Sequence, residues 1–151
     1  MSTLKDTITT DMRAALKARD ELTTSTLRMA LAAIGAAEVA GDAKRALSDD
    51  EVLAVLTKEA KKRREAATAF AQAGREEQAA RENAEGDVLG RYLPKQLDDA
   101  ELADIVAEAL AGAAATGKAQ MGPAMKAAQA AVAGRAEGGR VAAEVRRQLA
   151  V

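Results

Sequence analysis

Six basic residues in the last third of the chain carry the side chains best suited to bind a ligand. They are Lys118, Lys126, Arg135, Arg140, Arg146 and Arg147, and between Ala109 and the end of the sequence only Glu137 and Glu144 oppose them. Lysine and arginine hold phosphate oxygens through charge-assisted hydrogen bonds. The spacing of Arg140 and Arg147 puts them about 20° apart around a helix. The pattern predicts a local basic surface that binds phosphate groups.

Glycines lie among these basic residues, in the segment Gly134-Arg-Ala-Glu-Gly-Gly139. Glycine exposes backbone amides, and we expect a helix to begin at Gly139, flanked by Arg135 and Arg140. Amides, a helix N-terminus and arginine side chains together make a phosphate clamp. The same residues also fit a tight link in which the glycines only turn the chain and the arginines are solvated. The sequence leaves both interpretations open.

The amino-acid composition excludes several kinds of catalysis, because the chain contains neither cysteine nor histidine. Disulfides, zinc sites of the usual Cys/His type, cysteine nucleophiles and histidine-based proton transfer are all excluded. An enzyme of this composition would depend on Asp, Glu, Lys, Tyr, Ser or Thr, and no convergent group of these is recognisable. We therefore predict no catalytic residue, no metal site and no cofactor.

Glu59 and Arg63 lie in the middle of the apolar face of a long predicted helix that starts at Ser48 and ends at Ala73. One interpretation is an i,i+4 salt bridge whose aliphatic stems cover the core while the charged ends reach its rim. The other is a polar contact to a partner or substrate. The outward side of this helix carries four basic residues, Lys58, Lys61, Lys62 and Arg64. They fit a solvated helix face, and the alternative is contact with phosphate groups.

Composition favours an all-α fold. Apolar residues make up 48% of the chain while aromatic residues make up 1%, and alanine is abundant. Such a core has little volume per residue and suits close-packed helices, because the β-branched and aromatic residues that favour strands are scarce. The net charge of −1 gives no overall basic character that would indicate nucleic acid.

Apolar residues at three- and four-residue spacing predict the helices that position these side chains. The expected helices start at residue 3, cover 22–40 and 48–73, continue through a charged segment at 75–92, and then cover 98–117, 120–132 and the region of 141–149. Ser48 with Glu51, and Asp98 with Glu101, have the spacing of capping boxes. Both are flanked by apolar residues that form hydrophobic staples, which should fix these two helix starts.

The segment Val88–Leu97 separates two helical modules. Its Pro94 lacks an amide hydrogen and disfavours helical geometry in the residue before it, so the upstream helix should end near Leu93. The charge and the spacing of apolar residues differ between the sequence before this segment and the sequence after it. We expect an N-terminal helical domain at residues 1–95 and a small three-helix tail domain at residues 96–151.

The N-terminal sequence has no apolar run typical of a signal peptide, and no window approaches the length of a membrane span. We expect a soluble protein that is located in the cytoplasm, with no membrane partner.

Three segments in order give the chain a specific resemblance. They are Leu27-Arg28-Met29, then the region from Ser48 to the Tyr-Leu-Pro-Lys-Gln-Leu motif at 92–97, and then Met121-Gly-Pro-Ala-Met125 followed by Gly134-Arg-Ala-Glu-Gly138. Over essentially its whole length the chain resembles the GatB/YqeY domain family, in its stand-alone bacterial YqeY-like form. It departs from the common pattern at Pro123, at Glu137, where aspartate is frequent, and at the extra Gly139.

The resemblance implies a two-part helical protein whose tail is related to the end of the B subunit of glutamyl-/aspartyl-tRNA amidotransferase. In that enzyme the tail domain helps to hold tRNA outside the catalytic centre, which implies tRNA as a partner here. Stand-alone members tend to be described as having carbon–nitrogen ligase activity with glutamine as amide donor. The kinase-like and ammonia-channel machinery of the amidotransferase lies in domains that are absent from this sequence.

Three hypotheses for function follow. The first is a non-catalytic tRNA-binding module that uses the basic residues between Lys118 and Arg147. The second is a helical protein-interaction adaptor without an RNA role, in which the long helix and its Glu59 and Arg63 dock a partner or a second copy. The third, an enzyme, ranks last because no active-site cluster is evident.

Overall fold

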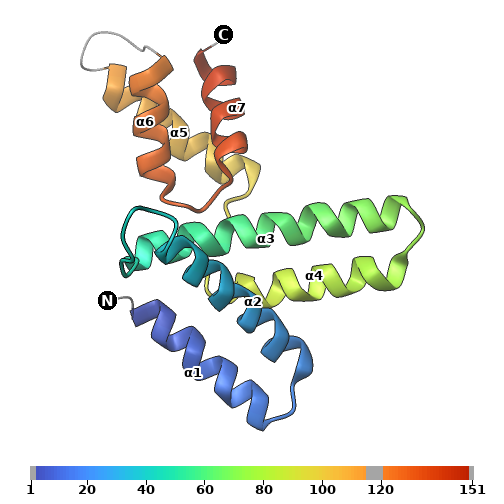
Figure 1. Ribbon diagram of the computed structural model, residues 1–151. Helices are drawn as coiled ribbons and strands as arrows, with labels where there is room; N and C mark the ends of the chain where they lie inside the picture. The colour runs from blue at the N-terminus through green and yellow to red at the C-terminus, as the bar shows by residue number, and fades with distance from the viewer. Residues whose placement is uncertain (1–2, 115–120, 150–151) are drawn as a thin grey trace. The chain divides into compact units, whose positions relative to one another are not determined.

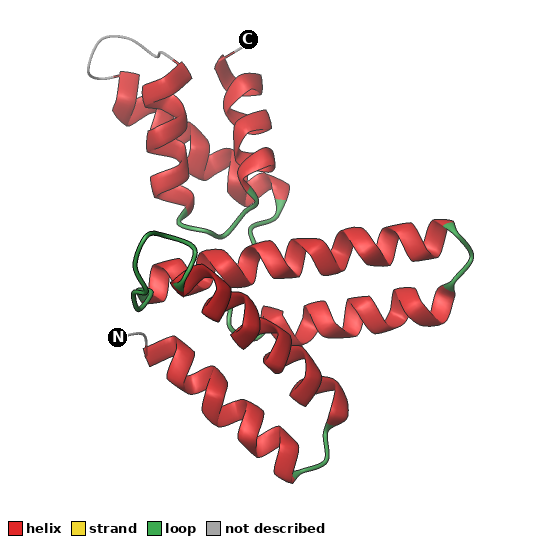
Figure 2. Cartoon of the chain, in the orientation of Figure 1, coloured by secondary structure: helices red, strands yellow, loops and turns green. Residues whose placement is uncertain are grey.

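The protein is all-helical in the residues that its computed structural model describes, which are 3–114 and 121–149. The helices are α1 (Thr3–Lys17), α2 (Glu21–Glu38), α3 (Asp49–Gln72), α4 (Glu76–Gly90), α5 (Asp99–Ala114), α6 (Met121–Val132) and α7 (Gly138–Leu149) (Figure 1). No strand occurs within these ranges (Figure 2). The predicted all-α fold class is confirmed.

The chain forms two compact units. The first unit, Met1–Leu93, contains α1 to α4, and the second unit, Pro94–Val151, contains α5 to α7. Helix α4 ends at Gly90, and the amides of Arg91, Tyr92 and Leu93 then bond to carbonyls three residues back. This tightened turn leads into Pro94, which cannot donate the next backbone hydrogen bond. The sequence predicts the boundary between the two domains after residue 95, whereas the first unit ends at Leu93.

Side-chain caps define the start of three helices. The Ser48 side chain accepts the Glu51 amide at 3.2 Å while the Glu51 carboxylate accepts the Ser48 amide at 3.1 Å, which is the predicted capping box. Asp98 and Glu101 form the second predicted box, at 2.7 and 3.2 Å. Sequence analysis did not identify the Asp20 cap of α2, whose carboxylate accepts the Thr23 amide at 3.1 Å.

Glu51 makes the stability of the first unit depend on pH. Hydrogen bonds from the Arg45 guanidinium, and then from the Ser48 amide, lower the pKa of the Glu51 carboxyl from 4.5 to about 2. A carboxyl with a lowered folded-state pKa stabilises the fold above its unfolded pKa, and this contribution is lost as the pH falls toward the folded value.

We therefore expect Glu51→Gln to be less stable than the wild type at neutral pH, with a difference that shrinks as the pH falls from 4.5 to about 2. Glutamine can still accept the Ser48 amide through its single oxygen, so the variant keeps that capping bond and removes the charge and one of the two acceptors for Arg45. Urea denaturation over this pH range measures the difference. A difference in stability that stays the same down to a pH of about 2 would contradict the prediction.

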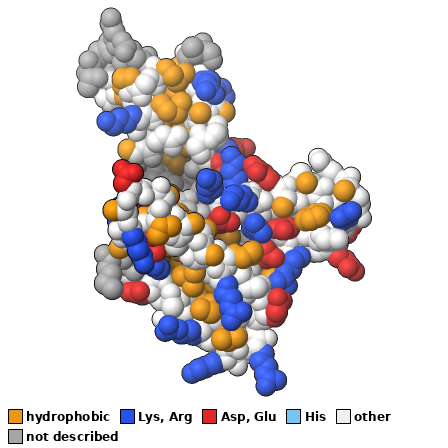
Figure 3. Space-filling view, in the orientation of Figure 1, with side chains coloured by type: hydrophobic (Ala, Val, Ile, Leu, Met, Phe, Trp, Pro, Cys, Tyr) orange, Lys and Arg blue, Asp and Glu red, His pale blue; other side chains and the backbone are white. Residues whose placement is uncertain are grey.

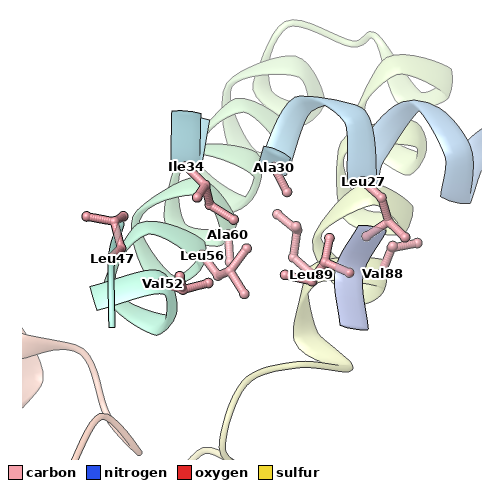
Figure 4. Close-up of a cluster of buried hydrophobic side chains, with 10 residues drawn as sticks. Leu27, Ala30, Ile34, Leu47, Val52, Leu56, Ala60, Val88 and Leu89 are labelled. Carbon is pink, nitrogen blue, oxygen red and sulfur yellow. The ribbon is translucent and has the colours of Figure 1, made fainter. Parts of the chain in front are cut away.

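The core of the first unit draws on all four of its helices (Figure 4). Helix α1 contributes Ile8, and α3 and α4 lie side by side as a hairpin. The side chains that are less than 2% exposed include Ile8, Leu27, Ile34, Val52, Leu56 and Val88. Alanines such as Ala30 and Ala60 fill positions where helices approach closely.

The second unit has its own core between three helices. Val106 of α5, Val132 of α6 and Val141 of α7 are fully buried in it. Met121 and Met125 pack against this cluster. None of the helices in the described ranges is both long enough and apolar enough to cross a lipid bilayer.

Candidate functional site

Helix α7 presents three of the six predicted basic residues. Its apolar side buries Val141 and Val145, so Arg146 and Arg147 are left exposed and Arg140 half-buried. One residue step turns a helix by about 100°, so Arg140 and Arg147 lie on the side of α7 away from Val141 and Val145, and Arg146 lies about 100° around the helix from Arg147. The structure therefore brings Arg140 and Arg147 to one side of the helix and Arg146 to another.

Two of these arginines have acidic neighbours. An Arg140 Nη2 atom lies 3.0 Å from Asp99 Oδ1 at the start of α5. Arg147 Nε lies 3.1 and 3.0 Å from the two carboxylate oxygens of Glu144. The hydrogen bonds from Arg147, and then from Gln148, hold the pKa of the Glu144 carboxyl at about 2. Glu144 therefore stays ionised at neutral pH and offsets part of the positive charge of α7.

The remaining predicted cations are placed differently. Lys126 is exposed on α6, on the side opposite to the buried Ala124 and Ala128. Within the described ranges neither Lys126 nor Arg146 forms an ion pair. Lys118 lies outside the described residues.

Arg135 has a structural role that the sequence did not indicate. Its Nε donates to the Val132 carbonyl and its Nη2 to the Ala131 carbonyl, both at 2.9 Å. These carbonyls belong to the last turn of α6, and the Val132 carbonyl also accepts the Arg135 amide at 3.1 Å. The Arg135 carbonyl in turn accepts the Leu97 amide at 2.7 Å. The guanidinium thus caps a helix within the second unit, which limits its use in a phosphate clamp.

The rest of the glycine segment also serves the fold. Gly134 has a φ of +78°, which glycine adopts without steric cost. Ala136 is buried in the core of the second unit, and α7 begins at Gly138, one residue before the predicted start. Of the two interpretations that the sequence left open, the geometry favours a tight link between α6 and α7.

We expect Arg135→Ala to destabilise the second unit by about 1–3 kcal/mol, because it leaves two carbonyls at the end of α6 without a side-chain donor. Arg135→Lys keeps the charge but not the two-pronged donor geometry, so it should recover only part of the loss. Thermal denaturation followed by circular dichroism measures both. Wild-type stability of Arg135→Ala would show that the cap is not needed.

Glu59 and Arg63 do not form the expected i,i+4 pair with each other. Glu59 pairs with Lys62 at 3.3 Å, while Arg63 Nη1 lies 3.3 Å from Glu85 and 3.4 Å from Glu82, both on α4. The Arg63 side chain is 22% exposed. The polar partner of Arg63 is therefore helix α4 of the same unit.

This contact belongs to a larger charge network in the first unit. Glu85, although charged, is buried, and its second oxygen accepts Arg81 Nε at 3.0 Å. Arg81 also bonds both carboxylate oxygens of Glu21, at 2.9 and 3.1 Å, and the Ser25 hydroxyl at 3.0 Å. The network joins α2, α3 and α4. Its only sequence signal is the i,i+4 spacing of Arg81 and Glu85.

A hollow in the first unit, missed in the sequence analysis, has a volume of about 440 Å³. The end of α1, the start of α2 and the turn after α4 surround it. It is lined by Asp11, Ala14, Ala15, Ala18, Asp20, Thr23, Arg91 and Tyr92. The lining unites the chain's only tyrosine with residues distant in sequence.

Hydrogen bonds fix the polar groups of this hollow. The Tyr92 hydroxyl donates to Asp11 Oδ2 at 2.6 Å, and the Thr23 hydroxyl donates to Asp20 Oδ2 at 2.7 Å. Burial, and then the hydrogen bond to the Asp11 carboxylate, raise the pKa of the Tyr92 phenol well above its usual value. The hydrogen bonds from Thr23, with a smaller effect of the Arg91 charge, lower the pKa of the Asp20 carboxyl. The Asp20 carboxylate is therefore ionised at neutral pH.

Positive and negative side chains are interspersed over the face of the first unit in Figure 3. In the part of the chain that the structure describes, no three Asp or Glu side chains are grouped so that they could hold a metal ion.

The fold and these surfaces define a class: a small all-helical protein of two units, with exposed basic residues on its last helix. The chain belongs to the YqeY family, since the family model described as "Yqey-like protein" matches residues 5–149. No curated protein matches the chain.

Proposed function

We propose that this YqeY-family protein is a non-catalytic tRNA-binding module that acts in the cytoplasm, with its second unit related to the tail of the tRNA amidotransferase B subunit. The RNA-binding residues in this proposal are Lys126, Arg140, Arg146 and Arg147, with Lys118 as a further candidate. Arg135 is left out because its guanidinium caps α6.

The observation that carries the proposal is the exposure of Arg146 and Arg147 on α7. The Arg147 side chain is 66% exposed although it contacts Glu144. The Glu144 side chain is only 15% exposed, but it keeps the hydrogen bond from Gln148 when Arg147 turns away. Since surface ion pairs contribute only about 0–1 kcal/mol, a phosphate can replace the carboxylate as the partner of Arg147 at small cost. The same argument applies to Arg140, because the side chain of its partner Asp99 is fully exposed.

Recognition in this proposal depends on phosphates and shape more than on bases. Phe70 and Tyr92 are the only aromatic residues and both belong to the first unit, so the second unit offers no aromatic surface for base stacking. We therefore expect little preference among tRNA sequences.

The adaptor hypothesis is supported less well. It relied on Glu59 and Arg63, and both side chains form ion pairs within the first unit. A partner that bound Arg63 would have to compete with Glu82 and Glu85 of α4.

The experiment is tRNA binding by the full chain across a salt series. Four phosphate contacts give a slope of log affinity against log salt of about −3 to −4, since each contact releases about 0.9 counterion. A measurable affinity with such a slope supports the proposal. No binding at low salt would overturn it and would direct attention to a protein partner.

A further inference from the structure

We propose that the hollow in the first unit is a binding site for a small zwitterion, specifically a free α-amino acid with an aliphatic side chain. The site is separate from the residues proposed to bind tRNA, all of which belong to the second unit.

The signs of the charges around the hollow determine the ligand class. Asp11 and Asp20 place two carboxylates on its lining and Arg91 places one guanidinium there. A lining with more negative than positive charge repels phosphate groups, so inorganic phosphate and nucleotides are disfavoured. A simple cation would gain from the carboxylates but would meet Arg91. A molecule with an ammonium and a carboxylate satisfies both signs.

The hydrogen bonds leave suitable groups available. Tyr92 occupies only the Oδ2 atom of Asp11, and no hydrogen bond to its Oδ1 is found among the described residues. Arg91 is exposed and forms no ion pair within the described ranges. One carboxylate oxygen can therefore accept a ligand ammonium while the guanidinium donates to a ligand carboxylate in the two-pronged geometry that arginine favours.

The shape of the hollow suits an aliphatic group. Ala14 and Ala15 of α1, and Ala18 in the turn just after it, line the hollow, and their small side chains leave the space open. The volume of about 440 Å³ lies at the lower end of the range for small-molecule sites. Methyl groups beside a few fixed polar atoms are the usual lining of such sites.

The test uses the full chain and three matched probes: leucine, isopentylamine, which lacks the carboxylate, and 4-methylpentanoate, which lacks the ammonium. Tyr92 is the chain's only tyrosine and there is no tryptophan, so intrinsic fluorescence reports directly on this hollow. Shifts of the Asp11 and Arg91 backbone amide signals in NMR spectra provide a second readout. We expect saturable binding of leucine and at least about tenfold weaker binding of either analogue, because each lacks one charged hydrogen bond.

Arg91→Gln should remove the preference for leucine over isopentylamine, whereas Arg13→Gln, an exposed change on α1 outside the hollow, should keep it. Thermal denaturation verifies that both variants fold. The proposal is overturned by leucine binding no more tightly than both analogues, by phosphate or AMP binding more tightly than leucine, or by equal discrimination in the two variants.

Discussion

Changing Arg146 and Arg147 together to glutamate is expected to lower the affinity for tRNA by about a hundredfold at low salt. Two charged hydrogen bonds at about 1.5 kcal/mol each account for a loss of this size, and the repulsion of phosphates by the new carboxylates adds to it. The salt dependence should also become shallower, by about 0.9 for each phosphate contact that is lost. Filter binding or fluorescence anisotropy over a salt series measures both quantities.

A matched control separates a local contact from an effect of net charge. Arg13→Glu combined with Lys17→Glu makes the same change in charge on exposed residues of α1, in the first unit. If both double variants lose affinity equally, binding depends on overall charge and the proposed surface on α7 is wrong.

Helix stability needs its own control, because Arg146 and Arg147 lie in the last turn of α7, where positive charge stabilises a helix. The double change to glutamine removes the charges without adding repulsion of Glu144. It should weaken binding less than the glutamate variant while its circular dichroism spectrum stays that of the wild type. A loss of helix in the glutamine variant would assign these arginines to the fold.

Leu56→Ala is expected to destabilise the first unit by about 2–5 kcal/mol. The Leu56 side chain is fully buried in the core that α2, α3 and α4 share (Figure 4). The substitution removes apolar contacts and leaves a cavity that the small alanines around it cannot fill, because the backbone relaxes only in part. Urea denaturation followed by Tyr92 fluorescence reports on this unit alone.

Leu16→Ala is the matched control, since it makes the same chemical change at a residue that is 52% exposed on α1. It should change the stability by no more than about 0.5 kcal/mol. Equal effects of the two substitutions would contradict the assigned core.

Helix boundaries were largely predictable because local sequence determines them. The capping boxes at Ser48 and Asp98 each depend on two residues only three positions apart. The local sequence is therefore enough to predict where α3 and α5 begin. The helix that was expected to end near Leu93 ends at Gly90, because the last residues before Pro94 form a tighter turn.

The pairing of charges was not predictable from spacing. Arg63 was expected to pair with Glu59, and instead contacts Glu82 and Glu85, which become neighbours only when α4 folds back along α3. In α4, a segment identified in the sequence by its charge, Ala79 and Glu85 are buried along with Val88 and Leu89. A charged residue such as Glu85 is buried when partners from other helices satisfy it, and sequence periodicity does not reveal those partners.

The sequence by itself determined the helical class, the two helix starts with capping boxes and the two apolar cores, because all three follow from residue type and from spacings within one or two turns. Only the tertiary structure decided what the polar residues do. It assigned Arg135 to the end of α6 and joined Tyr92 to Asp11, 81 residues away in the chain. The physical reason is that burial of apolar side chains acts through local periodicity, whereas a hydrogen bond requires two particular groups within about 3 Å.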